Sequence, residues 1–420
     1  MKALVNRLFL SLVLLLPWHS LIVNGYLRKY FSLIVLWKEL AVIALFILAI
    51  THKGPKISGI KLIILLSTIF LLTAHLFFNS VGLLAAYSYR IYLLPILMTI
   101  SLYKLSDLID WERISKWFIL GAFVMAVFTI IQQLFLGESI YLNAGYPVNS
   151  FSDEKLNFTF YIGYGLLQRG AGGFIAPIPY SVYLILALVL SYKYKELFSA
   201  KFGKALNMVL TISLVLTFTR STIATYLFFF VIPYLNFFTP KTVKYLLVLV
   251  FIVIIQFFIV PVSIQELELG TIDTFWSNST SLEDTSSAGH FESLDRGVKI
   301  AWENIGNGIG LGKVGAHTAA FFENALVIES GYLSVIIELG LLTAVFVYLS
   351  FPLVHYKKGS LSTVIILVYL AVSFLLPLIY YVELSLLILI TIEALNKDKD
   401  LYVDNSRKSV ASSFSEELYS

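Results

Sequence analysis

The chain has 420 residues, of which 58% are hydrophobic and only 13% carry a charge. A soluble globular chain has roughly 45–50% apolar and about 25% charged residues, so this composition excludes an ordinary soluble domain. The net charge of +4 says little about partners, and we expect no nucleic acid among them; the absence of cysteine excludes disulfides and thiolate metal sites.

The excess apolar residues occur in blocks of about 18–22, long enough to cross about 30 Å of hydrocarbon as helices. We therefore predict an all-α, polytopic integral membrane protein with a single membrane domain over residues 1–396. The N-terminal block has no small-residue cleavage site after it, so we expect a retained first span and not a signal peptide. In chain order the twelve predicted spans are 4–23, 31–50, 60–78, 83–103, 115–136, 177–192, 204–219, 221–238, 242–263, 331–355, 361–376 and 382–395.

The basic residues indicate the orientation of these spans. Of the 30 Lys and Arg residues, 20 fall in segments that face inward if the N-terminus is cytoplasmic, and 3 fall in the short outer turns. Such a bias sets membrane topology, so we expect both termini in the cytoplasm. Two long loops, 137–176 and 264–328, then face outward, and the polar, serine-rich residues 397–420 form a disordered cytoplasmic tail.

The longest polar stretch of the chain lies between about 262 and 340. Along it follow Arg296, Trp302, the alternating glycines Gly306, Gly308, Gly310 and Gly312, then His317 and Glu329. We expect a short interfacial helix over Leu294–Ile305 and, with the loop 137–176, an active site on the outer face of the membrane. The glycines follow no strand and belong to no βαβ unit, which excludes a dinucleotide loop. They form either a flexible linker or a backbone that passes close to a sugar or phosphate.

Three arginines on separate outer segments are candidates for binding a diphosphate, because the guanidinium fork matches phosphate oxygens in pairs. Arg169 precedes a glycine-rich turn, Arg220 occupies a tight turn between two spans, and Arg296 precedes Trp302. The alternative is that these side chains are solvated or contact lipid phosphate non-specifically.

A fourth arginine, Arg90, lies inside the fourth predicted span. A buried arginine costs about 2.5–3.5 kcal/mol on insertion scales, so it is a functional candidate by default. The alternative is snorkelling or a structural ion pair with Glu39 or Glu338.

Two residues are candidates for a general base. His317 lies in the long outer loop, although a single histidine is more often structural than catalytic. Glu329 stands directly before Ser330, a plausible helix N-cap, so its alternative role is to compensate the helix dipole. The helix that follows is expected to run inward, so that its positive end favours an ionised Glu329 and a nearby anionic substrate.

These features resemble the O-antigen polymerase and O-antigen ligase superfamily of bacterial surface-polysaccharide enzymes. The resemblance rests on Arg169 with its glycine turn and Pro177, on Thr217-Phe218-Thr219-Arg220-Ser221, and on the order Arg296, Trp302, glycine run and Glu338-Leu339-Gly340-Leu341-Leu342. It implies a GT-C-like, metal-independent membrane glycosyltransferase of the bacterial inner (cytoplasmic) membrane. Donor and acceptor would be glycans linked to undecaprenyl diphosphate, with Arg169, Arg220 and Arg296 as site arginines. A flippase and a chain-length regulator are the expected protein partners, and no cofactor is expected.

Ligases of this superfamily typically have a histidine where the last outer loop meets the next span. Here that position reads Glu329-Ser330, and His317 lies twelve residues earlier. This difference favours a polymerase of lipid-linked repeat units over a ligase that transfers glycan to lipid A core. A transporter of polysaccharide or lipid-linked sugar is the alternative of a different class. It should place polar residues near mid-membrane on broken helices, whereas this chain gathers them in two outer loops.

Overall fold

A computed structural model describes most of the membrane domain. The described residues are 1–78, 82–137, 139–145, 161–162, 167–168, 170–174, 176–217, 285–315, 326–328, 330–351, 353–357, 361–375 and 378–397. All structural statements below concern these residues.

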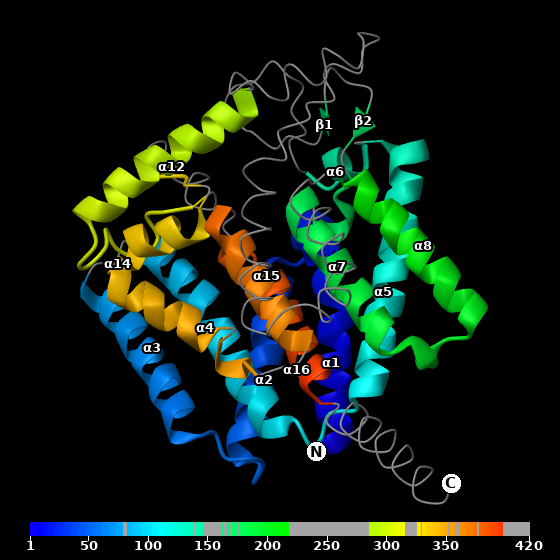
Figure 1. Cartoon of the computed structure of the whole chain (residues 1–420), viewed down its shortest axis with the longest axis horizontal. Helices are drawn as coiled ribbons and strands as arrows, with labels where there is room; N and C mark the ends of the chain where they lie inside the picture. The colour runs from blue at the N-terminus through cyan, green and yellow to red at the C-terminus, as the bar shows by residue number, and fades with distance from the viewer. Residues whose placement is uncertain are drawn as a thin grey trace, which may run out of the picture.

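The described chain is helical, as predicted (Figure 1). Its α-helices are α1 (Lys2–Leu15), α2 (Trp37–Thr51), α3 (Gly59–Phe78), α4 (Gly82–Leu105), α5 (Trp111–Ile131), α6 (Ser139–Asn143), α7 (Pro177–Lys193), α8 (Ala200–Leu216), α12 (Thr285–Glu303), α14 (Gly331–Ser350), α15 (Leu361–Leu375) and α16 (Val382–Asn396). Shorter helical turns include the π-helix η2 (His19–Tyr26) and the 3-10 turns η6 (Gly172–Phe174) and η10 (Leu378–Tyr380). The only strands in the described part are β1 (Tyr161–Ile162) and β2 (Leu167–Gln168), which pair antiparallel.

Six helical segments of the described chain are long and apolar enough to cross a membrane. They are Lys2–Lys29, Ser32–Thr51, Gly59–Phe77, Gly82–Leu105, Trp111–Leu136 and Gly331–His355. The other predicted spans on described residues coincide with α7, α8, α15 and α16, which are shorter helices. The predicted spans 221–238 and 242–263 lie outside the described residues. A helical membrane protein is therefore confirmed, whereas twelve spans and the outward position of the loops stay predictions.

Local sequence explains where several helices begin. The Asp110 side chain accepts a hydrogen bond from the Arg113 amide at 3.1 Å and caps α5. Pro177 stands in the first position of α7, where its missing amide hydrogen is not needed. Ser330 caps α14 by accepting from the Leu333 amide at 3.4 Å.

The helices are arranged around α16, whose side chains from Leu384 to Leu395 are all buried. It packs against α4, α7 and α15, and Figure 1 shows it in the middle of the molecule. A helix that is apolar all round belongs inside a protein or a membrane. By contrast, α3 exposes Ile60, Ile63 and Phe70, as expected for a helix that faces lipid.

The two ends of this helix layer differ. We call the end at which α6, α12 and η6 lie the loop end, and the end at which α1 begins and α16 finishes the terminal end (Figure 1). At the terminal end, the Lys193 ammonium donates to the carbonyls of Ala394 and Leu395 at 3.1 and 2.9 Å, which satisfies the last turn of α16. The first residues of the chain and the end of α16 lie at one end of the molecule (Figure 1).

Reporter fusions test the expected topology directly. A fusion near Asn278 should report outside and a fusion after Lys397 should report inside, because basic residues concentrate in the segments assigned to the cytoplasm. Paired alkaline phosphatase and green fluorescent protein fusions make the measurement. An outside signal after Lys397 would contradict the layout.

Candidate functional site

The central irregularity of the structure is a break in α14. Gly340 has φ 75° and ψ 164°, far from helical values, so the helix consists of two pieces, 331–339 and 341–350. The rings of Tyr332 and Tyr348 lie 4.5 Å apart between centroids, so the first piece folds back over the second. The predicted span 331–355 is therefore a segment of spanning length that is broken at Gly340, and its direction across the membrane stays a prediction. The break lies at a glycine because glycine alone among the residue types adopts this backbone conformation without strain.

The glycine run fills this break. A broken helix leaves main-chain carbonyls and amides without hydrogen-bond partners. In an apolar surrounding these groups need other partners. The amides of Ile309 and Gly310 donate to the carbonyls of Ile337 and Glu338 at 2.7 and 3.0 Å, and the Leu341 amide donates to the Ile305 carbonyl at 2.8 Å. The run and Ile305, the residue before it, therefore supply hydrogen-bond partners on both sides of Gly340.

The glycines of the run lie against the protein's own backbone. A Cβ at Gly308 would lie 2.5 Å from the Glu338 carbonyl oxygen, and one at Gly312 would lie 2.7 Å from the carbonyl carbon of Leu84. Both residues have positive φ, whereas Gly306 has open space around it. The close backbone approach expected for this run is thus present, but it serves the packing of α14 and α4.

The Glu338 side chain completes this junction. Its carboxylate is fully buried and accepts from the Gly312 amide at 2.7 Å and from the hydroxyls of Tyr92 and Tyr380 at 2.6 and 3.2 Å. Ser88 also hydrogen-bonds to it. One carboxylate thereby joins the glycine run, α4, α14 and the turn before α16.

A second buried polar cluster is formed by residues of η2, α2, α4 and α16. The Lys38 ammonium lies 2.8 Å from Glu383 Oε1 and 3.8 Å from Glu39 Oε1. It also lies 2.5 Å from Nε2 of His19, whose Nδ1 accepts from the Trp37 indole at 2.9 Å. Glu39 and Glu383 stand in the first turns of α2 and α16, where the helix dipole favours negative charge.

Arg90 belongs to this cluster. Its Nη1 lies 2.7 Å from Glu39 Oε1, and its guanidinium stacks over the Tyr87 ring at 4.3 Å. Arg90 Nε and Glu39 Oε2 are buried and have no hydrogen-bond partner within the described residues. The structural ion pair with Glu39, proposed above as the alternative for Arg90, is therefore present, and the pair with Glu338 is not.

The glycine-rich turn after Arg169 is also fixed by packing. The Gly170 amide donates to the Leu216 carbonyl at the end of α8, at 2.9 Å. A Cβ at Gly173 would lie 2.5 Å from the Pro17 carbonyl oxygen, so this turn inserts between the first helical segment and α5. Because Arg169 precedes Gly170 and Arg220 follows α8 by a few residues, this contact joins the segments that carry both arginines.

Arg296 lies on α12, where a short helix over Leu294–Ile305 is expected; the structure has a longer helix that begins at Thr285 and ends at Glu303. The Arg296 side chain is exposed, and its neighbour Gly297 packs on Ile328 and Leu333 at the start of α14. On the same helix Lys299 and Asp295 form an exposed ion pair at 2.6 Å. The hydrogen bond and the charge of Asp295 raise the pKa of Lys299.

The other predicted site residues are not placed. Arg169, Arg220, His317 and Glu329 lie outside the described residues, so their roles stay predictions. Of the six candidates, the structure thus locates Arg296 at the loop end and Arg90 in the buried ionic cluster.

Sequence reasoning missed most of the buried polar centre. Tyr92, Tyr380, Glu383 and His19 are not among the candidate residues named from the sequence. A signal was present, since ionisable residues inside apolar spans are costly and usually paired with one another. Lys38, Glu39, Arg90, Glu338 and Glu383 all fall within predicted spans.

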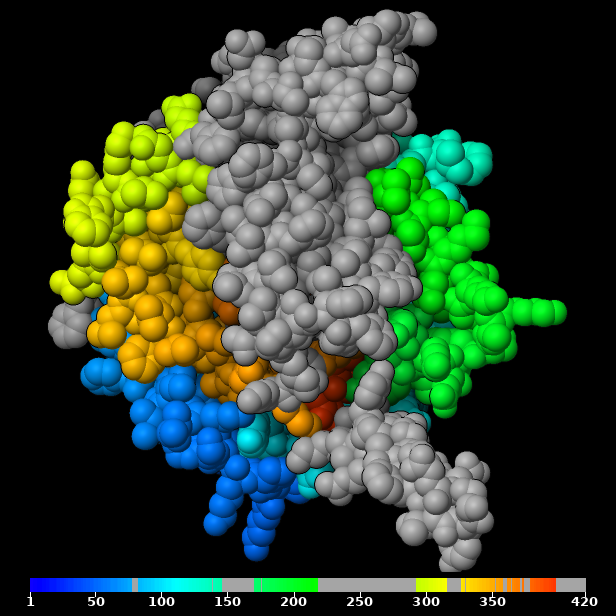
Figure 2. Space-filling view, viewed as in Figure 1, coloured from blue at the N-terminus to red at the C-terminus, as the bar shows by residue number. Residues whose placement is uncertain are grey.

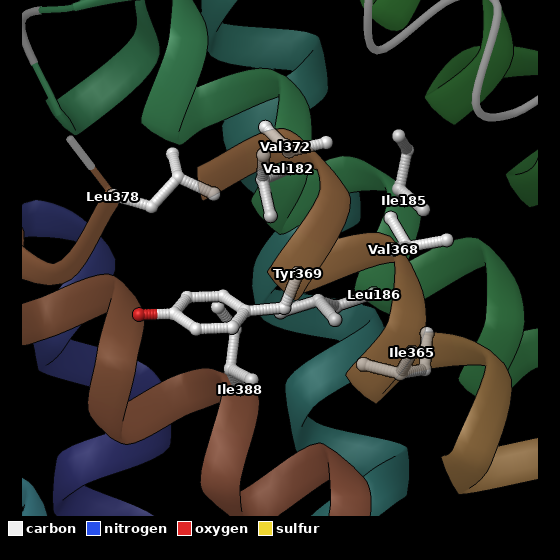
Figure 3. Close-up of a pocket in the computed structure, with 9 residues that line it drawn as sticks. All are labelled: Val182, Ile185, Leu186, Ile365, Val368, Tyr369, Val372, Leu378 and Ile388. Carbon is white, nitrogen blue, oxygen red and sulfur yellow. The ribbon is translucent and has the colours of Figure 1, made fainter. Parts of the chain in front are cut away.

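An apolar pocket lies between α7, α15 and α16 (Figure 3). It is lined by Val182, Ile185, Leu186, Ile365, Val368, Tyr369, Val372, Leu378 and Ile388. Figure 3 shows the Tyr369 hydroxyl directed away from the other labelled side chains. This lining offers no group that could bind a sugar or a phosphate.

No known protein family, curated protein or solved structure matches this chain.

Substitutions in the glycine run test the junction at Gly340. Gly308→Ala and Gly340→Ala should each lower the unfolding midpoint of the purified protein. A non-glycine residue at positive φ costs about 1–3 kcal/mol, and each Cβ would also contact backbone at 2.5 Å or closer. Gly306→Ala is the matched control and should stay close to wild type, since nothing lies within 4 Å of its Cβ. A stable Gly340→Ala protein would contradict the close packing of the break.

A double-mutant cycle tests the buried ion pair. Lys38→Met alone should destabilise by about 3–5 kcal/mol, because it leaves the Glu383 carboxylate buried without its partner. Lys38→Met combined with Glu383→Gln should cost clearly less than the sum of the single changes. Thermal unfolding in detergent measures this coupling. The exposed pair Asp295 and Lys299 is the control, and its removal should leave the midpoint unchanged. Strict additivity at Lys38 and Glu383 would exclude a coupled pair.

Proposed function

We propose that this protein is a membrane glycosyltransferase that joins oligosaccharide repeat units carried on undecaprenyl diphosphate into surface polysaccharide. The product is O-antigen, capsule or exopolysaccharide. Transfer takes place at the loop end, on the outer face of the bacterial inner membrane. The reducing end of the growing chain leaves its carrier diphosphate and is linked to a hydroxyl of the next lipid-linked unit.

The observation that carries this proposal is the 2.9 Å hydrogen bond from the Gly170 amide to the Leu216 carbonyl. It holds together the segments that lead to Arg169 and Arg220, as a shared diphosphate site requires. Arg296 adds an exposed guanidinium at the same end of the molecule, beside the start of α14. Arginines that converge on a diphosphate would stabilise the charge that develops on this leaving group.

In this mechanism Glu329 takes the proton from the acceptor hydroxyl, and His317 is the alternative base. Glu329 directly precedes the Ser330 cap of α14, where helix amides favour negative charge. A ligase that transfers the finished glycan to lipid A core is the alternative within the same class.

A lipid-linked sugar transporter is the second candidate, and two observations favour it. The chain has a broken helix and a buried ionic cluster within its apolar segments, both of which are typical of transporters. Polar residues therefore lie on a broken helix as well as in the two loops that are expected to face outward. A transporter would move glycan across a vesicle membrane without lengthening it, whereas a polymerase lengthens it without transport.

Lysine substitutions test the arginine site. Arg169→Lys, Arg220→Lys and Arg296→Lys keep the charge but lose the two-pronged geometry, so polymer formation should fall sharply in each. The measurement is the glycan profile of a deletion strain that carries each variant. Lys299→Gln is the control on α12 and should leave polymer formation intact. Normal polymer in all three lysine variants would mean that these arginines are only solvated or lipid-facing.

Glu329→Gln tests the general base and separates polymerase from ligase. The variant keeps the shape but cannot accept a proton, so polymer formation should fall by about 10²–10⁴-fold, leaving single repeat units. Full-length polymer that stays on the carrier lipid would instead identify a ligase. A normal glycan profile, together with loss of polymer in His317→Ala, would transfer the role of the base to His317.

A further inference from the structure

The helix α12 has three distinct faces when its residues are placed at about 100° each around the axis. One face is buried: Gly297, Ile300 and Ala301 pack toward Ile328 and Ile337. This contact places α12 alongside the first piece of α14, at the loop end of the helix layer. Figures 1 and 2 show α12, in yellow-green, at the edge of the molecule.

Beside the buried face lies an exposed apolar flank. Val298 is 55% exposed, Trp302 76% and Ile305, just beyond the helix, 39%. Their spacing of four and three residues places them in one line along the helix. A large exposed tryptophan in such a line needs an apolar contact, since water does not favour it.

The remaining face is charged. Asp295, Arg296 and Lys299 are exposed there, together with Glu292 and Glu303. Going around the helix, the order is buried face, apolar flank, charged face. This is the arrangement of a helix that lies in a membrane interface, with its apolar flank toward the acyl chains and its charges toward water.

We propose that α12 lies in the headgroup region of the surrounding bilayer, with the flank formed by Val298, Trp302 and Ile305 inserted into it. The position of α12 along the apolar helices agrees with this depth in the bilayer. It packs on residues that begin or directly precede α14, where an apolar segment starts. Tryptophan prefers this level of a membrane, where its ring is partly apolar and partly wet. Arg296 is about 120° from Trp302 around the helix, so the inserted flank keeps this arginine away from lipid.

The chain contains no cysteine, so a single introduced cysteine is the only thiol that the spin label can modify. Val298→Cys, Trp302→Cys and Lys299→Cys are each labelled with a nitroxide and placed in vesicles of phosphatidylethanolamine and phosphatidylglycerol. Electron paramagnetic resonance then measures contact with oxygen, which enters lipid, and with a water-soluble nickel chelate.

Positions 298 and 302 should show an oxygen-to-nickel accessibility ratio severalfold higher than position 299, and a depth of about 5–10 Å below the headgroups. Equal, water-like ratios at all three positions would overturn the proposal. Spin–spin broadening at position 302 that disappears on dilution with unlabelled protein would assign the flank to a second copy of this chain, which also overturns it. The measurement detects the position of α12 whether or not glycan is made, so it is independent of the proposed function.

Discussion

The arrangement of the loop end depends on one constraint: main-chain amides and carbonyls inside an apolar surrounding need hydrogen-bond partners. Gly340 breaks α14 and removes such partners, and the run 306–312 supplies them from another segment of the chain. Because Ile309 and Gly310 bond to carbonyls of α14, the polar segment before α14 is anchored to the helix layer. The Glu338 carboxylate extends the same junction to Tyr92 and Tyr380. The position of α12, and with it Arg296, follows from this anchoring.

A buried ionic cluster links four helical elements of the membrane domain. Lys38 and Arg90 carry two positive charges, and Glu39 and Glu383 carry two negative ones, so the cluster is neutral when His19 is neutral. Removing four charges from water is costly, and the pairing and the helix dipoles of α2 and α16 offset part of that cost. The cluster connects η2 and α2, which are close in sequence, to α4 and to the distant α16. These ion pairs and hydrogen bonds fix the positions of the four elements relative to one another along their axes.

The sequence predicted the helices well because apolar blocks of spanning length have few alternatives in a membrane. It also predicted a helix around Arg296 and named Glu39 as one possible partner of Arg90. It did not predict the break at Gly340, which lies within an apolar run and has no proline beside it. It did not predict what the glycines approach either, because a glycine signals close packing without identifying the neighbour. The contacts of Glu338 and Lys38 link residues up to several hundred positions apart, which periodicity cannot reveal.

These contacts also bear on whether the site is fixed or moving. A transporter needs two arrangements of its broken helices, and each ligand must favour one of them. Here the break in α14 is closed by hydrogen bonds on both sides, and at Gly308 and Gly340 there is no space even for a methyl group. Moving one piece of α14 against the other would expose these main-chain groups to an apolar surrounding. Transfer of a glycan from a diphosphate has the opposite requirement, because arginines assist a leaving group only when their positions are held before reaction. The close packing at both glycine-rich turns therefore favours a fixed scaffold for group transfer over a moving pathway.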